Sequence, residues 1–205
     1  FKYLSENNYQ TYHFSELEGL KQSSSLPKKS VIITFDDVYV SQLKLAYPLL
    51  KKYNLKASFF IPFAYVGGLD DWNTAKEPIM SVNQLQSLDS RIVELGLHSF
   101  AHKNYTKLTP NEVQEDFNLC MDFVHKNQLN VQNILAYPYG KYPKKNPGKT
   151  LFFKILKANH MAFALRIGNR INKFPLKRPY EVQRIDIKGE DSILKFKLKL
   201  RFGKL

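Results

Sequence analysis

The sequence predicts an α/β fold with a parallel sheet, and the alternation of its segments supports this. Short apolar segments rich in β-branched and aromatic residues alternate with segments whose apolar residues recur at helical spacing. Strands that alternate with helices pair in parallel, because each helix carries the chain back before the next strand begins. In such folds the ligand site forms beyond the carboxyl ends of the strands. Here one apolar segment, 31–35, runs directly into Asp36 and Asp37.

Length and composition indicate one folded domain. The chain has 205 residues, of which 43% are hydrophobic, and its 15 Phe and 12 Tyr argue against disorder. We find no internal repeat and no low-complexity segment, and we assign residues 1–205 to a single domain. No apolar run approaches the roughly 20 residues that a membrane-spanning helix needs. The single cysteine, Cys120, excludes an intramolecular disulfide.

The formal net charge is +13, and it is unevenly placed. Residues 141–205 contain 18 Lys and Arg but only 4 Asp and Glu. A basic end of this kind could face nucleic acid, anionic lipid or an acidic polymer, and it could equally be a solvated surface that keeps the protein soluble. The charge shows where a polyanion would bind and does not identify one.

The first part of the chain predicts short elements. They are, in order, the end of a helix, a turn at 7–8, a strand at 9–13, a second helical turn, a polar loop at 22–29 and a buried strand at 31–35. Ser15 and Glu18 have the spacing of a capping box in the second helical turn.

The middle of the chain alternates between helices and strands. The expected elements are a helix at 41–53, a strand at 57–61, a loop at 67–78, a short helix at 81–88 and a strand at 92–97. In the first helix, Leu43, Ala46, Leu49 and Leu50 recur at helical spacing, so we expect them to face the core despite Pro48.

A long helix is expected to begin at Thr109. Thr109 is a good N-cap, Pro110 suits the first helical position, and Glu112 completes a capping box. One face of this helix is apolar, at Val113, Phe117, Cys120 and Val124. The remaining elements are a strand at 133–137, a helix at 148–159, strands at 161–167 and 182–187, and a tail at 192–205. The tail alternates basic and apolar residues, which fits a strand as well as a helix.

Two acids at the end of a buried strand cost free energy unless a cation pairs with them. His98 and His102, after the strand at 92–97, supply further ligands. Asp37, His98 and His102 form a two-histidine, one-carboxylate set that leaves positions open for water and substrate, as in catalytic metal sites. Asp36, beside the set, is then the general base. Taken singly, an Asp-Asp pair is often a helix cap, and two His four residues apart are usually solvent-facing.

Three ordered motifs resemble the polysaccharide deacetylases of the NodB-homology class. They are Thr-Phe-Asp-Asp at 34–37, His-Ser-Phe-Ala-His at 98–102 and Tyr-Pro-Tyr-Gly at 137–140. The resemblance covers nearly the whole chain. The stretches 47–53, 57–62, 65–72 and 178–187 are most similar to the bacterial exopolysaccharide branch, which acts on poly-N-acetylglucosamine and similar glycans.

The resemblance implies a distorted (β/α) barrel with fewer than eight strands. It implies that Asp37, His98 and His102 bind a divalent metal ion, with zinc expected and cobalt or nickel as alternatives. Asp36 would be the general base, and the backbone N–H of Tyr139 would help to hold the oxyanion.

The resemblance also suggests how a glycan substrate binds and where the protein acts. We expect substrate contacts at Pro138, Tyr139 and Trp72. For Trp72 the alternative is a ring that anchors its own loop, and this is equally favoured. The substrate class favours the cell envelope or the extracellular space, although no signal peptide is visible. We do not expect a nucleic-acid partner, because that function would rest on charge alone.

Three departures from the family pattern bear on activity. Val38 stands where the family usually has Gly, which predicts an altered loop because a β-branched residue resists positive φ. The Arg usually found shortly before Pro-Tyr is absent, which leaves the orientation of the base unexplained. No late His matches the general acid. In the exopolysaccharide branch this acid lies near the amino end, before the segment where this chain begins, so the resemblance implies that the acid is missing if Phe1 marks a truncation. The remaining histidines, His13, His125 and His160, are expected to be structural or exposed.

The sequence therefore predicts a metal-dependent hydrolase that removes acetyl groups from a bacterial polysaccharide. N-acetyl groups are the first choice and O-acetyl groups the second. The alternative is a catalytically degenerate module of the same fold that binds metal or glycan. Val38 and the missing acid favour that alternative.

Overall fold

Six strands of the protein form one parallel sheet in chain order. The computed structural model describes residues 1–20 and 25–203. The six strands are β3 (Ile33–Asp36), β4 (Ala57–Ile61), β5 (Val93–Leu97), β6 (Val131–Ala136), β7 (Phe163–Ile167) and β8 (Val182–Arg184). A separate two-stranded sheet pairs β1 (Gln10–Thr11) with β2 (Ser30–Val31).

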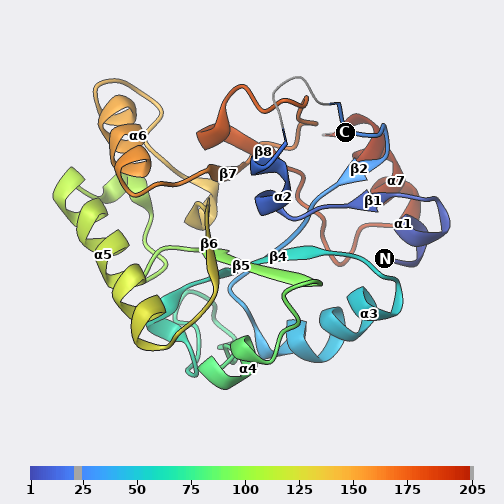
Figure 1. The fold of residues 1–205 in the computed structure, drawn as a ribbon, viewed down its shortest axis with the longest axis horizontal. Helices are drawn as coiled ribbons and strands as arrows, with labels where there is room; N and C mark the ends of the chain where they lie inside the picture. Colours follow the sequence, from blue (N-terminus) through green and yellow to red (C-terminus); the bar gives the residue numbers. More distant parts are fainter. Residues whose placement is uncertain (21–24, 204–205) are drawn as a thin grey trace.

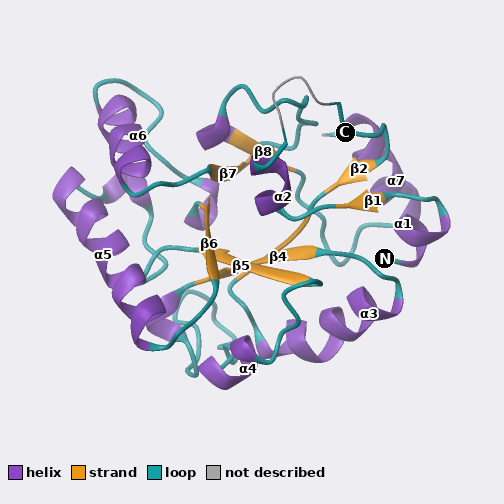
Figure 2. Cartoon of the chain, in the orientation of Figure 1, coloured by secondary structure: helices purple, strands orange, loops and turns teal. Residues whose placement is uncertain are grey.

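Helices surround the curled sheet (Figure 1, Figure 2). The α-helices are α1 (Lys2–Glu6), α2 (Phe14–Glu18), α3 (Tyr47–Lys52), α4 (Val82–Gln86), α5 (Pro110–Lys126), α6 (Gly148–Ala158) and α7 (Ile193–Phe202). Single turns of other helix types are the π-helix η1 (Gln42–Ala46) and the 3₁₀-helices η2 (Phe63–Tyr65), η3 (Tyr105–Lys107), η4 (Pro138–Gly140) and η5 (Pro179–Glu181). The alternation of strands with helices and the parallel pairing are as the pattern predicted.

The barrel does not close, because β3 and β8 end the sheet and do not pair with each other. A cavity of about 1200 Å³, lined mostly by apolar side chains, lies along this opening. The prediction of a distorted barrel with fewer than eight strands is therefore confirmed. One predicted detail is wrong: the segment 31–35 is not a buried strand. It divides at Ile32 into β2 and β3, and every residue of β3 is only half-buried, because an edge strand of an open barrel has a neighbour on one side.

The core lies between the sheet and the helices, and β4 and β5 are buried along their whole length. The start of α5 is confirmed, since Thr109 and Glu112 form a capping box around Pro110. Its predicted apolar face is also confirmed, and the buried residues are Val113, Phe117, Cys120 and Val124.

The predicted helix at 41–53 is interrupted. Residues 42–46 form the π-helix η1, and Pro48 lies in the first turn of α3, where its missing N–H is tolerated. The change of hydrogen-bond pattern turns the helix, so Leu49 is 42% exposed while Leu50 is fully buried. The expectation that Leu49 faces the core is wrong.

Near the chain ends, one further expectation is wrong and one open alternative is decided. The capping box in α2 is formed by His13 and Glu16, two residues before the predicted Ser15 and Glu18. The tail is helical, as α7. The expected loop at 22–29 lies partly outside the described residues, as do residues 204–205 of the tail.

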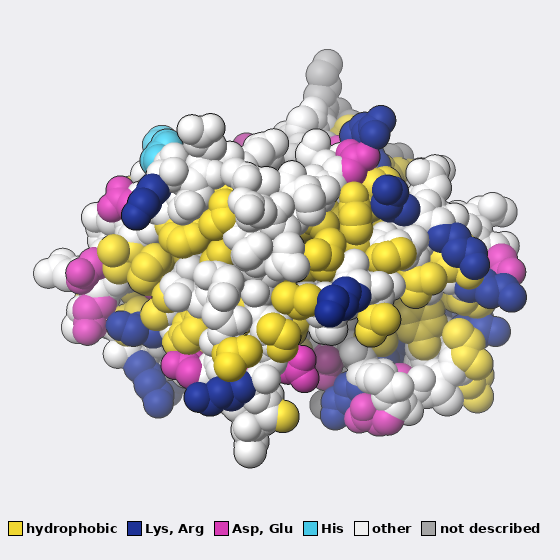
Figure 3. All heavy atoms as spheres, turned by 90° about the horizontal axis from the view of Figure 1, so that it is seen from below, with side chains coloured by type: hydrophobic (Ala, Val, Ile, Leu, Met, Phe, Trp, Pro, Cys, Tyr) yellow, Lys and Arg dark blue, Asp and Glu magenta, His cyan; other side chains and the backbone are white. Residues whose placement is uncertain are grey.

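The surface is mixed in character. On the face seen in Figure 3, apolar side chains show in several places, with Lys and Arg side chains between them. Among the described residues, none of the helices combines the length and apolar character that a bilayer crossing requires.

Candidate active site

The polar residues singled out in the sequence gather at the carboxyl ends of three strands of the parallel sheet. Asp36 is the last residue of β3 and Asp37 follows it, while His98 directly follows β5. Tyr139 lies in η4, which follows β6. Parallel strands end at the same edge of the barrel, so three distant parts of the chain contribute to one site.

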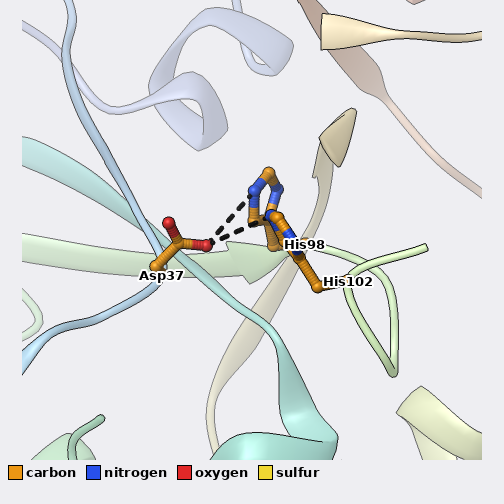
Figure 4. Close-up of side chains that lie close together, drawn as sticks. All are labelled: Asp37, His98 and His102. Atoms are coloured by element: carbon orange, nitrogen blue, oxygen red, sulfur yellow. Dashed lines mark ion pairs between the residues drawn. The ribbon is translucent and has the colours of Figure 1, made fainter. Parts of the chain in front are cut away.

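Asp37, His98 and His102 point toward one another (Figure 4). The Oδ1 atom of Asp37 lies 3.5 Å from Nε2 of His98 and 3.5 Å from Nε2 of His102. One ligand atom from each residue lies within 4.8 Å of the others. Both histidines are buried, and the Asp37 side chain is 15% exposed.

The chemistry of these donors fits a metal ion. Nδ1 of His98 lies 2.7 Å from the carbonyl oxygen of Ala136, so Nδ1 carries the proton and Nε2 presents its lone pair. Asp37 Oδ1 and His102 Nδ1 are buried without a hydrogen-bond partner among the described residues. Burial, and then the neighbouring His98, lower the pKa of His102 to about 3, which keeps the ring neutral as a metal ligand must be.

The carboxyl of Asp37 is poorly accommodated without a cation. Burial raises its pKa to about 6, and the charge of Asp36 acts in the same direction. An opposite charge would reverse both effects. The three residues therefore form a donor set that fits a divalent cation.

The loop that carries both histidines is held by a buried carboxylate on α5. Asp116 accepts hydrogen bonds from the Ser99 hydroxyl (2.8 Å), the Phe100 N–H (2.9 Å) and the Tyr105 hydroxyl (2.8 Å). Ser99 and His102 have positive φ angles of 65° and 51°, which non-glycine residues adopt at a cost. Asp116 is thus a positioning residue for the two imidazoles.

We expect Asp116→Ala to weaken metal binding about 10- to 100-fold, because outer partners of metal ligands have effects of this size. It should also lower the free energy of unfolding by about 2–4 kcal/mol, since two buried donors and one half-buried donor lose their acceptor. Metal titration and denaturant unfolding measure the two effects. Asp122→Ala, an exposed position on the same helix, is the matched control. Unchanged metal affinity in Asp116→Ala would remove Asp116 from the site.

Arg184, at the end of β8, holds the carboxylate of Asp36. Its Nη1 and Nη2 lie 2.6 Å from Oδ1 and 2.7 Å from Oδ2 of Asp36, a bidentate pair across the barrel opening. Burial opposes ionisation of Asp36, but the charge and hydrogen bonds of Arg184 outweigh it and lower the pKa of Asp36 to about 2. Oδ2 of Asp36 also lies 3.8 Å from His98 Nε2. Arg184 therefore orients Asp36, although no arginine stands shortly before Pro138 in the sequence.

We expect Arg184→Gln to lower kcat by about 100-fold, within the usual range for perturbing a general base. Burial would then act on Asp36 without the opposing charge, so its pKa should rise. The acidic limb of the pH–rate profile should move to higher pH. Arg184→Lys, which keeps the charge but not the bidentate geometry, should recover part of the activity. A pH profile that does not move would contradict the positioning role.

The turn after β3 keeps its strained backbone despite the missing glycine. Asp37 and Val38 have φ angles of 72° and 45°, where a β-branched residue is rare. The Val38 side chain is fully buried and its carbonyl accepts a hydrogen bond from the N–H of Met80. Packing thus stabilises a conformation that costs about 1–3 kcal/mol. Val38 leaves Asp37 close to both histidines.

Trp72 packs directly on the histidine pair. Its ring stacks on His102 with centroids 3.8 Å apart, and its indole N–H donates to the Tyr39 hydroxyl at 3.1 Å. Tyr39 in turn donates to Asp70, which is 1% exposed. One face of Trp72 is therefore occupied by His102, and its contact with substrate stays a prediction.

The turn after β6 lies beside the histidine pair and forms a second wall of the site, in addition to Trp72. Tyr139 is 51% exposed, has a φ angle of 58°, and its ring centroid lies 4.7 Å from that of His102. Pro138 is buried, so it offers little surface to a ligand. Contact of Pro138 and Tyr139 with substrate stays a prediction.

The three remaining histidines lie away from the site. His13 is 6% exposed and contacts the carbonyl of Ile92, which precedes β5, so it sits at the opposite end of the barrel. His125, in the last turn of α5, and His160 are exposed. Within residues 1–20 and 25–203, His98 and His102 are the histidines of the site.

An open parallel barrel with two carboxylates and two histidines at its strand ends defines the NodB-like class. The structure of IcaB from Ammonifex degensii matches with a TM-score of 0.78 over 98% of this chain and 85% of that one, at 23% identity. The Streptococcus pyogenes deacetylase PplD, in complex with acetate, gives a TM-score of 0.78 over 96% and 82%, at 20% identity. At such identities the likeness shows the fold alone.

The sequence comparison gives the family. Residues 23–150, more than half of the chain, match the family described as Polysaccharide deacetylase, so the chain belongs to this family. The poly-beta-1,6-N-acetyl-D-glucosamine N-deacetylase of Staphylococcus aureus is 28% identical over 145 residues, which are 68% of this chain and 50% of that protein. The chain spans about half the length of the curated relatives it matches. The resemblance seen in the three motifs is confirmed.

Proposed function

We propose that residues 1–205 form one catalytic domain, a metal-dependent deacetylase that removes N-acetyl groups from an amino-sugar polymer. The observation that carries the proposal is the convergence of Asp37, His98 and His102 beside a carboxylate, Asp36, that Arg184 holds in place. The name of the Staphylococcus aureus relative supports a substrate of the poly-N-acetylglucosamine type. A polymer of this class supports a site of action at the cell envelope. N-deacetylation is proposed before O-deacetylation on the same ground.

Asp37, His98 and His102 would hold the metal ion, with zinc proposed first and cobalt or nickel as alternatives. Such an ion polarises a carbonyl group and lowers the pKa of water. Asp36 accepts the proton of the attacking water, in an orientation fixed by Arg184. The backbone N–H of Tyr139 donates to the oxyanion of the tetrahedral intermediate. Trp72 and the exposed ring of Tyr139 bound the space for the sugar.

The test combines metal content with acetate release from β-1,6-linked N-acetylglucosamine oligomers in the presence of added zinc, cobalt or nickel. The expected result is one metal ion per chain and release of acetate. Metal binding without acetate release would instead support the degenerate module, which Val38 and the unmatched general acid favour. A chain that binds no metal would refute the ligand set.

A further inference from the structure

A groove continues from the proposed catalytic centre along one side. It encloses about 480 Å³ and shares two residues, His102 and Tyr139, with the centre. The segment between His102 and α5 forms one wall, and the turn after β6 forms the other. A polymer whose acetylated unit lies at Asp37 can therefore place its neighbouring unit in this groove.

The groove is lined by three lysines and by no acid. Lys103, Lys107 and Lys141 are all exposed side chains. None of them forms an ion pair with a carboxylate in the described part of the chain, whereas Lys149 and Lys199 pair with Glu181 and Asp191. Three like charges around one groove repel one another, so an anion bound between them would be stabilised.

Glu112 lies within electrostatic reach of Lys103, and Asp36, Asp37 and Asp71 act on His102 or Tyr139, where the groove meets the centre. Hydrogen bonds from Thr109, and to a smaller extent the charge of Lys103, lower the pKa of Glu112. The Glu112 carboxylate is already engaged by the Thr109 N–H and hydroxyl in the capping box of α5. The Glu112 carboxylate lies beyond ion-pair distance of Lys103, so it does not neutralise this lysine by direct contact.

The other lining groups suit a sugar. The ring of Tyr139 is 51% exposed, and Leu108 is half-buried beside it. A flat ring and an aliphatic side chain provide apolar surface against which the C–H face of a sugar can pack. Exposed Asp71 accepts a hydrogen bond from the Tyr65 hydroxyl, and its charge adds to the effect of burial in raising the pKa of Tyr139. Asp71 is therefore within electrostatic reach of the groove, although it does not line it.

We infer that the groove binds an anionic group on the sugar unit next to the one that is deacetylated, so that the preferred substrate is an acidic amino-sugar polymer. The charged group is a carboxylate or a phosphate, which the lysines recognise alike. This inference rests on the proposed deacetylase function and goes beyond it in naming the substrate's charge. A carbohydrate is favoured over a nucleic acid because the groove opens directly onto the acetyl-processing residues.

The experiment compares kcat/KM of the metal-loaded chain on three oligomers of equal length. One is neutral N-acetylglucosamine, one alternates N-acetylglucosamine with a uronic acid, and one carries phosphate groups. We expect at least one acidic oligomer to be preferred by about tenfold at low salt, the size that a few exposed ion pairs can supply, with the preference falling as salt rises. Preference for only the uronate or only the phosphate oligomer identifies the anion.

The lysines are tested by Lys103→Gln, Lys107→Gln and Lys141→Gln combined. The ratio of acidic to neutral kcat/KM should fall to about one. The matched control combines Lys126→Gln, Lys154→Gln and Lys157→Gln, exposed lysines on α5 and α6 that remove the same charge outside the groove. The control should keep the ratio. Equal ratios in all three proteins would overturn the inference.

Binding measurements separate this inference from the proposed function. If no oligomer is turned over, the deacetylase proposal fails, and calorimetric titration with the same oligomers still tests the groove. Tighter binding of an acidic oligomer to the wild type than to the groove variant would support the inference. Equal binding to both would overturn it. A single-stranded DNA oligomer that binds through the same lysines more tightly than any glycan would overturn the carbohydrate assignment.

Discussion

Asp36→Asn is expected to lower kcat by about 1000-fold while the protein keeps its metal ion. Asn has the shape of Asp but cannot accept a proton from water, and general bases typically contribute factors of about 100 to 10,000. The proposed ligands Asp37, His98 and His102 are untouched, so metal content should stay at one ion per chain. Acetate release and elemental analysis of the same sample measure the two quantities. Undiminished turnover would remove Asp36 from the mechanism.

A control is needed because the substitution also leaves Arg184 without its charge partner. Breaking a fully buried pair costs about 3–5 kcal/mol, and here roughly 2 kcal/mol is expected because the Asp36 side chain is 28% exposed. The double variant Asp36→Asn, Arg184→Gln removes both charges and should recover most of this stability. It should recover none of the turnover. If the single variant loses activity and the double variant regains it, then misfolding, and not the missing base, caused the loss.

The parts of the fold that sequence could predict are those with local signals. The start of α5 follows from Thr109, Pro110 and Glu112, which interact only with one another and with the first turn. β4 is recognisable because all five of its residues are apolar or small and it is covered on both sides. The two motifs around Asp37 and His98 could be brought together because parallel strands end at the same edge of the sheet.

The parts that were missed depend on the closure of the barrel. Arg184 lies 148 positions from Asp36, and nothing in its neighbourhood distinguishes it from the other basic residues of the carboxyl-terminal third. Arg184 and Asp36 meet only because β8 and β3 lie on the two sides of the barrel opening. The same opening explains why β3 is half-buried. Local periodicity reports which residues face a core and does not report which strand stands at an edge.

The site is energetically unfavourable for the fold without a bound cation. Asp37 and Val38 hold positive φ angles, and Oδ1 of Asp37 has no hydrogen-bond partner among the described residues. The raised pKa of Asp37 expresses the same penalty, since the folded chain resists ionisation of this carboxyl. Such a penalty at a strand end, beside two imidazole ligands, would be compensated by a bound divalent ion.

Asp37→Asn is therefore expected to abolish metal binding and, in the absence of metal, to make the protein more stable. The pKa of Asp37 is raised from 3.8 to about 6, so the ionised carboxylate is less favourable in the fold than in the unfolded chain. The penalty is complete above about pH 6, where it amounts to a few kcal/mol at most, and it disappears below the unfolded pKa. With a chelator at pH 8 the variant should thus have a higher Tm than the wild type. The two Tm values should converge as the pH falls toward 4.

Added metal should reverse this order. An ion at 1000 times its Kd stabilises the wild type by about 4 kcal/mol, which for a chain of this length raises Tm by roughly 8–16 °C. Asp37→Asn should show no such rise, and neither should His102→Ala, which removes a different ligand. Calorimetric melting with and without zinc, together with metal content, measures the difference. An unchanged metal content in His102→Ala would break the proposed ligand set, because three protein ligands are needed to hold an ion that keeps positions open for water and substrate.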